Sequence, residues 1–258
     1  MLSQTKKRVV EAITNTFEHG TPQAAYESCE RLKDGRGFTC GRAGFTTATG
    51  DAYWVVDRYV RARPVVPLAL YLPELRRLAS LPACDAAGRG FTGNLSGFGR
   101  AWALAANNDP QFRAIQDELN QQLYMIPALK LAKQYEITTP LGRAIFYDTL
   151  VQHGYTSSAD GNESGIDTQR ILDLTGGRRF GESETMWLNR FLHVRGQMLC
   201  CYPDNVWPAS ADRVHDLRQL LLEGQTNLSG NVLLASTGVR IMSAPTAPSS
   251  VASWVLPA

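Results

Sequence analysis

Hydrophobic residues recur at helical spacing along most of this chain, and that spacing limits the fold more than any other feature. Val9, Ile13 and Phe17 share one helical face, and similar stripes follow in later segments. We predict a first helix that ends near Phe17, a second that starts at Asp51, and a third that runs from Phe112 to before Pro127. Three more are predicted at about 141–153, 184–199 and 211–223. Residues 34–49, rich in glycine and threonine, favour a small sheet or an extended loop. We therefore predict a mainly α (α+β) protein with one small β element.

Size and charge narrow the class of partner. The 258 residues, 44% of them hydrophobic, can form one large domain or two lobes around a cleft. A formal net charge of +2, with no basic block longer than residues 6–8, does not indicate nucleic-acid binding. No apolar run reaches the ~18 residues of a membrane span, and MLSQTKK at the start lacks the apolar stretch of a signal peptide. We expect neither a nucleic-acid nor a membrane partner.

The cysteines and the polar loops offer no metal site. The five cysteines are Cys29, Cys40, Cys84, Cys200 and Cys201. Their spacing matches no zinc motif, and they can form at most two disulfides, which the sequence does not pair. The segment DGNESGIDTQRI begins like a calcium loop, but its twelfth position is Ile171 instead of a bidentate glutamate. We expect neither a metal nor an organic cofactor.

One glycine-rich segment, ERLKDGRGFTCGRAGFTTATGD, places carboxylates in a frame that can turn tightly. Asp34 directly precedes a glycine-bracketed Arg36, and the segment closes on Asp51, which could instead be a plain helix N-cap. The pentapeptide GRGFT recurs at 88–92 without a preceding carboxylate, and we interpret this second copy as loop composition. The contrast makes Asp34 a candidate functional residue.

Three charged residues stand on helical faces that are otherwise apolar. Asp148, Arg195 and Arg213 each fall within or beside a hydrophobic stripe. A buried carboxylate without a cationic partner would be very costly, so these residues should form a buried Arg–Asp–Arg network joining three helices. Such a network can be purely structural, or it can adjust carboxylates in a catalytic cleft.

Glu18 is a second candidate carboxylate. It precedes His19 and Gly20 at the end of the first predicted helix, where the helix dipole and apolar packing beside Phe17 disfavour a negative charge. A carboxyl group that retains its proton can act as a general acid. The alternative is a solvated residue at a helix end.

The glycine-rich segment resembles the signature of family 46 of the glycoside hydrolases, the chitosanases, and bacillus-type members most of all. Further similar segments are TNTFEHGT, LALYLPELRRLA, AIFYDTLVQHG, ETMWLNRFLHVR and RVHDLRQLL. The resemblance covers most of residues 5–235. It implies a lysozyme-like, two-lobed fold with a substrate cleft between the lobes. It also implies endo-hydrolysis of β-1,4-linked glucosamine polymers, such as chitosan, with inversion.

The resemblance implies roles for individual residues. Glu18 matches the general acid, Asp34 the general base, and Thr39 the residue that helps to hold the attacking water. The expected sugar contacts are Arg36, Thr49, Asp51 and Tyr26. The charge network expected behind the acid is Asp148, Arg195 and Arg213. We expect a secreted, monomeric enzyme with a catalytic domain at 1–242 and a tail rich in proline, serine and alanine at 243–258.

Two alternative functions remain open at this level. The protein could be a hydrolase of the same fold that acts on chitin or peptidoglycan. Asp51 argues weakly against this alternative, because an acetylated sugar offers no ammonium group to pair with its carboxylate. A non-catalytic carbohydrate-binding protein is disfavoured because both Glu18 and Asp34 are present. Trp102 and Trp187 lie inside helix-like segments, and we expect them in the core, not as sugar platforms.

Overall fold

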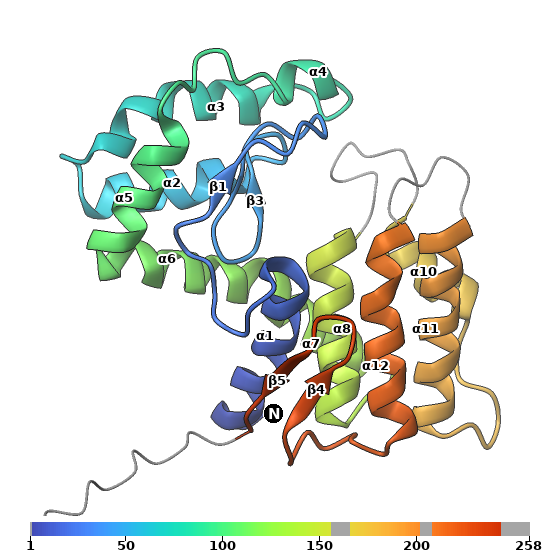
Figure 1. The fold of residues 1–258 in the computed structure, drawn as a ribbon. Coiled ribbons are helices and arrows are strands. Elements are labelled where there is room, and N and C mark those ends of the chain that lie inside the picture. The colour runs from blue at the N-terminus through green and yellow to red at the C-terminus, as the bar shows by residue number, and fades with distance from the viewer. Residues whose placement is uncertain (1, 156–165, 202–207, 244–258) are drawn as a thin grey trace, which may run out of the picture.

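Two hydrophobic cores divide the molecule into two lobes. The computed structural model describes residues 2–155, 166–201 and 208–243. One core lies among the elements between Cys40 and Leu119, and the other joins the first helix to the elements from Met125 onward. Figure 1 shows the first of these lobes at the top and the second below it. The observed fold is mainly helical with small antiparallel sheets, as predicted.

The upper lobe combines a small sheet with five helices and a 3-10 turn. Its sheet has the order β1 (Cys29–Glu30), β2 (Thr39–Cys40), β3 (Phe45–Thr46) and is antiparallel throughout. The helical elements are α2 (Asp51–Ala62), η1 (Pro67–Tyr71), α3 (Leu72–Ser80), α4 (Ala86–Arg89), α5 (Phe98–Asn108) and α6 (Pro110–Asn120). Two of the three strands fall inside the predicted β segment, and β1 precedes it.

The lower lobe surrounds helix α8. Its helical elements are α1 (Gln4–His19), α7 (Ile126–Gln134), α8 (Pro140–His153), α10 (Thr168–Thr175), α11 (Glu184–Cys201), η3 (Pro208–Ala211) and α12 (Asp212–Leu222). A hairpin of β4 (Val232–Leu234) and β5 (Val239–Ile241) completes it. Helix α8 contacts α1, α7, α10 and α12, so it lies at the centre of this lobe.

The lobes are joined by residues 20–28 and by a continuous helical passage. Helix α6 runs into a π-helical turn, η2 (Gln121–Met125), and then into α7. The predicted helix end before Pro127 was therefore wrong. Pro127 comes directly after the π-helical turn, at the start of α7, and the chain stays helical through it.

The other predicted helices are present, and several elements were missed. The helices predicted at the first segment, at Asp51, and at 141–153, 184–199 and 211–223 correspond to α1, α2, α8, α11 and α12. Helix α5 contains Trp102, whose segment was expected to be helix-like, whereas α3, α4, α7 and α10 and the β4–β5 hairpin were not predicted. Trp102 and Trp187 are fully buried, which confirms their place in the core. The tail beyond Ser243 lies outside the described residues.

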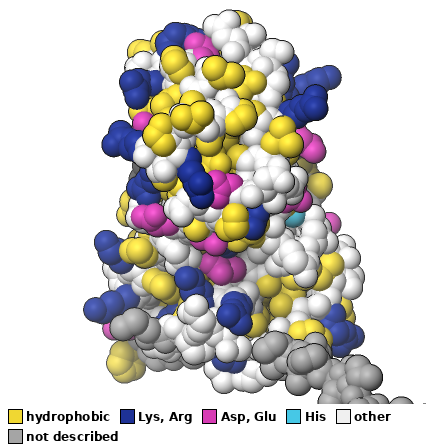
Figure 2. All heavy atoms as spheres, turned by 90° about the vertical axis from the view of Figure 1, so that its left-hand side faces the viewer, with side chains coloured by type: hydrophobic (Ala, Val, Ile, Leu, Met, Phe, Trp, Pro, Cys, Tyr) yellow, Lys and Arg dark blue, Asp and Glu magenta, His cyan; other side chains and the backbone are white. Residues whose placement is uncertain are grey.

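The surface and the cysteines complete the description. Figure 2 shows the face on the left of Figure 1, where hydrophobic side chains gather over the upper lobe and charges of both signs are interspersed.

Disulfides join Cys29 to Cys40 and Cys200 to Cys201, and Cys84 is an exposed free thiol. Within 2–155, 166–201 and 208–243, no helix has both the length and the apolar character needed to cross a bilayer.

Candidate active site

Glu18 ends helix α1 and is held by an arginine from the opposite end of the chain. Gly20 caps the helix with a φ of 72° and donates its N–H to the Thr16 carbonyl. Arg213 Nη1 donates to Glu18 Oε1 at 2.9 Å, and the Glu18 side chain is 25% exposed. The Arg213 guanidinium also lies 5.4 Å from the centre of the Phe17 ring. Glu18 is thus a partly buried, ion-paired carboxylate instead of a freely solvated helix end.

The predicted buried network is present behind Glu18. Asp148 accepts from Arg195 Nη2 at 2.7 Å and from Arg213 Nη1 at 3.4 Å. The side chains of Asp148 and Arg195 are fully buried. Arg213 therefore contacts two carboxylates, and the network joins α8, α11 and α12 to the end of α1.

His153 extends this network on the side away from Glu18. Arg195 Nε donates to His153 Nε2 at 3.3 Å, and Arg195 Nη2 donates to Gln152 Oε1 at 2.5 Å. Burial, followed by the positive charges of Arg195 and Arg213, holds the pKa of His153 well below its usual range. His153 is consequently a neutral acceptor, which suits it to orient Arg195.

Asp34, the other candidate carboxylate, lies in the loop between β1 and β2. Its Oδ1 accepts the backbone N–H of Arg36 at 3.0 Å, and its Oδ2 accepts Arg36 Nε at 2.8 Å. Burial raises the pKa of Asp34, but the backbone and side-chain hydrogen bonds from Arg36 outweigh it and lower the pKa below its ordinary value. Gly35 and Gly37 have φ of 82° and 75°, which the tight turn around Arg36 requires. Asp34 is therefore an ionised group on a loop shaped by its glycines.

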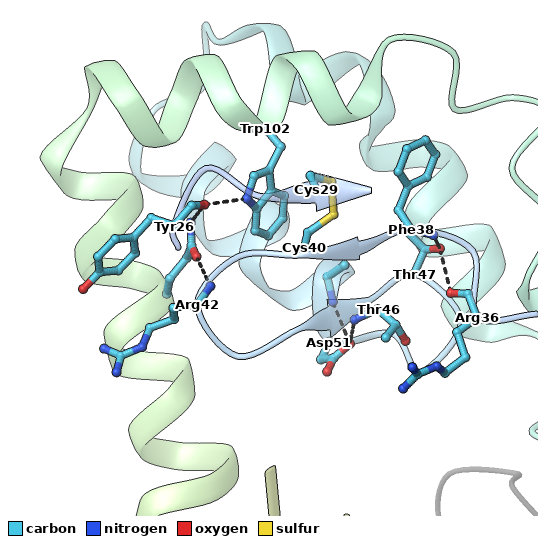
Figure 3. Close-up of a disulfide and its surroundings, with 12 residues drawn as sticks. Tyr26, Cys29, Arg36, Phe38, Cys40, Arg42, Thr46, Thr47, Asp51 and Trp102 are labelled. Carbon is cyan, nitrogen blue, oxygen red and sulfur yellow. Dashed lines mark hydrogen bonds between the residues drawn. A yellow bond between two sulfur atoms is a disulfide. The ribbon is translucent and has the colours of Figure 1, made fainter. Parts of the chain in front are cut away.

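Thr39 supplies an unused polar atom next to this loop. It belongs to β2, and its hydroxyl oxygen is buried without a hydrogen-bond partner among the described residues. A buried hydroxyl in native proteins is usually satisfied by protein or by water, so this one is available to a water or a ligand. Cys40 follows it and is bonded to Cys29, which closes the loop that carries Asp34 (Figure 3).

Asp51 is the first residue of α2 and is nearly fully buried. The suggestion that it is the N-cap was wrong, because Gly50 takes that position with a φ of 91°. Asp51 Oδ1 accepts the N–H groups of Thr46 at 2.7 Å and Ala52 at 3.0 Å, and the Thr49 hydroxyl at 2.5 Å. Figure 3 shows its carboxylate beside β3, facing the same way as Arg36.

The charge state of Asp51 reflects its surroundings. Burial raises its pKa to about 6, and the hydrogen bonds from Thr49, Thr46, Tyr124 and Ala52 oppose that rise. Tyr124 contributes through its hydroxyl, which donates to Asp51 Oδ2 at 3.2 Å. The sequence offered no signal for this contact, because Tyr124 lies in the π-helical turn between the lobes.

The second GRGFT copy packs against the first. A β-carbon placed on Gly90 would lie 2.0 Å from the carbonyl oxygen of Gly35. Arg89 Nη2 donates to the Thr49 carbonyl at 3.0 Å, and Arg89 Nε donates to the Ala48 carbonyl. The interpretation of this copy as mere loop composition was therefore wrong: it supports the backbone on both sides of the candidate site.

Tyr26 lies apart from the other candidate residues. Its hydroxyl donates to Asp117 at 2.7 Å, and the Arg42 guanidinium lies 5.8 Å from the centre of its ring. Burial and the hydrogen bond to Asp117 raise its pKa to about 12. Figure 3 shows Tyr26 at the end of the sheet opposite Arg36. The structure does not bring Tyr26 together with Asp34 or Asp51.

One pocket of the described structure lies beside Tyr26 and not beside the candidate carboxylates. This pocket of about 550 Å³ is lined by Tyr26, Asn15 and Arg42 together with parts of α1 and β5, and Glu18, Asp34 and Asp51 are not among its lining residues. Among the residues that the structure describes, no group of three or more His, Cys, Asp or Glu side chains is placed to hold a metal ion. The chemistry available at the candidate site is that of its carboxylates and arginines.

Comparison with known proteins agrees with this geometry. The profile of Glycosyl hydrolase family 46 matches residues 12–232. A chitosanase from Bacillus subtilis (strain 168) is 44% identical over 241 residues, which is 91% of this chain and 83% of that protein.

Solved structures are similar over nearly the whole chain. A Gynuella sunshinyii chitosanase in complex with chitotetraose has a TM-score of 0.82 at 33% identity, covering 94% of this chain and 98% of that chain. A glutamate-to-alanine mutant of a Bacillus subtilis MY002 chitosanase, complexed with 6 GlcN, has a TM-score of 0.80 at 40% identity, covering 95% and 100%.

Proposed function

Because the chain belongs to glycosyl hydrolase family 46, we propose that it is an endo-acting chitosanase that cleaves β-1,4 bonds between glucosamine units with inversion. The observation that carries the proposal is the placement of two carboxylates, Glu18 on the lower lobe and Asp34 on the upper lobe, each held by its own arginine. An inverting glycosidase needs one carboxylic acid and one carboxylate on opposite sides of the scissile bond.

Glu18 acts as the general acid. In its protonated form Glu18 gives its proton to the oxygen of the leaving sugar as the glycosidic bond breaks. Arg213 lies 2.9 Å from Glu18 Oε1 and stabilises the carboxylate that this transfer leaves behind. Asp148 and Arg195 fix Arg213 from behind, so the stabilising charge is in place before the reaction begins.

Asp34 acts as the general base. The hydrogen bonds from Arg36 lower its pKa and keep it ionised, so it can take a proton from the attacking water. The Thr39 hydroxyl, which has no partner in the described part of the chain, supports a role in orienting that water. The water adds to the anomeric carbon from the side opposite the leaving group, and the product is the inverted anomer.

Asp51 explains a preference for deacetylated sugar. It is a nearly buried carboxylate on the Asp34 side of the molecule, and an ammonium group would compensate its charge, whereas an acetamide would not. Arg36 and Thr49 border the same surface and are proposed sugar contacts, as is Tyr26 at a more distant position. The similar structures with chitotetraose and 6 GlcN support a glucosamine oligomer as the ligand.

Secretion is part of the proposal. The Cys29–Cys40 disulfide lies in the segment that carries Asp34, and disulfides persist in oxidising compartments outside the cytosol. The experiment that tests the function is proton NMR of the anomeric signals during digestion of highly deacetylated chitosan. Early α-anomer product supports chitosan hydrolysis with inversion, and early β-anomer contradicts the assigned roles of Glu18 and Asp34. If chitosan gives no product and an acetylated polymer is cleaved, chitosan is rejected as the substrate and the acetylated polymer takes its place.

A further inference from the structure

The geometry points to Tyr124 as a specificity-determining residue, which positions the free oxygen of Asp51 for the ammonium group of the substrate. This inference rests on the proposed function, because it concerns the sugar contact assigned to Asp51. Tyr124 does not belong to the segment that carries Asp34 and Asp51, and it lies in the π-helical turn between the lobes. π-Helical turns of this kind occur often at functional sites.

The two oxygens of Asp51 have different surroundings. Oδ1 accepts three hydrogen bonds of 2.5 to 3.0 Å, from Thr46, Thr49 and Ala52. Among the described residues, Oδ2 accepts one hydrogen bond, from the Tyr124 hydroxyl at 3.2 Å. With three donors Oδ1 is saturated, whereas Oδ2, with one, retains capacity for a cationic donor. The Tyr124 hydroxyl thus lies beside the oxygen that a sugar ammonium would contact.

Tyr124 is held from both lobes. Its ring packs against the hydrophobic core of the upper lobe and against that of the lower lobe. Its hydroxyl reaches Asp51 across this junction. The position of the hydroxyl is therefore fixed by η2 at the junction between the lobes, whereas the contacts of Oδ1 all come from the segment between Thr46 and Ala52.

The charged groups near Asp51 are otherwise engaged. Arg89, on α4, donates to the carbonyls of Ala48 and Thr49, and Arg36 pairs with Asp34. The ion pairs on the helices that pack against α2 are Arg76 with Asp57, Arg77 with Glu74, Arg58 with Glu118, and Arg42 with Asp117. No cation in the described residues forms an ion pair with Asp51, which leaves its charge to be matched by the substrate.

Removal of the Tyr124 hydroxyl should have two effects. The first is weaker binding of deacetylated substrate, because Oδ2 loses the group that fixes its position. The second concerns pH. The hydrogen bond from Tyr124 lowers the pKa of Asp51, so its loss moves that pKa further above 6, and the charge that attracts the ammonium disappears at a higher pH as the solution is acidified.

The test compares Tyr124→Phe with Tyr59→Phe. Tyr59 is a matched control because it is a buried tyrosine of the upper lobe whose hydroxyl also donates to an aspartate, Asp109, at 2.9 Å. KM and kcat are measured on glucosamine oligomers between pH 5 and 8 for both variants and the wild type. The substrate amines also titrate in this range, but their effect on KM is the same for all three enzymes and does not alter the comparison.

The expected result is specific to Tyr124→Phe. Its KM should rise roughly tenfold with little change in kcat, which is the low end of the effect of losing a hydrogen bond to a charged group. The rise of KM on acidification should begin at a higher pH than in the wild type, and Tyr59→Phe should match the wild type in both respects. An unchanged KM and pH profile, or a fall in kcat alone, would overturn the inference. Failure of the wild type to cleave the oligomers would instead reject the proposed function.

Discussion

Gly90 packs so closely on Gly35 that a β-carbon at position 90 would lie 2.0 Å from the Gly35 carbonyl oxygen. Gly35 follows Asp34 directly, so this contact sets the position of the proposed base. The backbone of Gly90 has a φ of −79°, which any residue can adopt. The requirement for glycine there comes from the neighbouring backbone, not from its own conformation.

Gly90→Ala should therefore reduce kcat strongly, because the backbone at Gly35 must move and carry Asp34 with it. Displacement of a catalytic group by about 1 Å can cost roughly a hundredfold in rate. Gly177→Ala is the matched control, since no atom lies within 4 Å of its β-carbon position and its φ is not positive. Steady-state kinetics on chitosan distinguish the two. Equal activity in both variants would show that the Gly90 contact does not position the base.

Asp34→Asn should lower kcat by about 10²–10⁴-fold, the usual contribution of a general base. The fold should be retained, because the Asp34 side chain is 26% exposed and its partner Arg36 is 40% exposed. Circular dichroism and thermal melting check the fold, and reducing-sugar release measures turnover. A folded variant that retains near wild-type kcat would reject Asp34 as the base.

Asp148→Ala should destabilise the protein by about 3–5 kcal/mol, because it leaves two buried arginines without their shared carboxylate. Glu118→Ala breaks an exposed ion pair with Arg58 and should cost at most about 1 kcal/mol. Urea denaturation of both variants gives the comparison. Similar losses for the two would mean that the buried network contributes no more than a surface pair.

Arg36→Ala should move the acid limb of the kcat profile to higher pH. The base must be ionised to act, and Arg36 lowers the pKa of Asp34, so the wild type stays active to a lower pH than an ordinary aspartate would allow. Loss of the guanidinium raises that pKa and narrows the active range from the acid side. Arg31→Ala is the control, because Arg31 is exposed in the same loop and has no ion pair in the part of the chain described. Coincident acid limbs for wild type and Arg36→Ala would contradict this account.

Residues whose role follows from local chemistry could be predicted from the sequence. A carboxylate on an apolar helical face needs a buried cation, so the Asp148 network was predictable before any family resemblance. Asp34 was singled out by its glycines, although its role as base came from the resemblance. The helices with strong apolar periodicity were predicted for the same local reason.

The missed features depend on contacts between distant segments. Nothing near Gly90 indicates that Gly35 will lie against it, and the helical spacing at Phe112 and Leu123 gives no sign of a π-helical turn that brings Tyr124 to Asp51. The alternative interpretation of Asp51 as a helix N-cap was wrong because Gly50, with its left-handed backbone, takes that position instead. These features are set by tertiary packing, and a local pattern does not encode them.

The separation of the proposed acid from the proposed base depends on the segments that join the two lobes. Glu18 belongs to the lobe built on α8 and Asp34 to the lobe built on the small sheet, and the lobes are joined by residues 20–28 and by η2. Inversion requires the two carboxyl groups to be about 6.5–9.5 Å apart, with room for a water. On the proposed mechanism, the room for the attacking water is therefore set by residues far from the chemistry, so a substitution in the joining segments should lower turnover without altering either proposed catalytic residue.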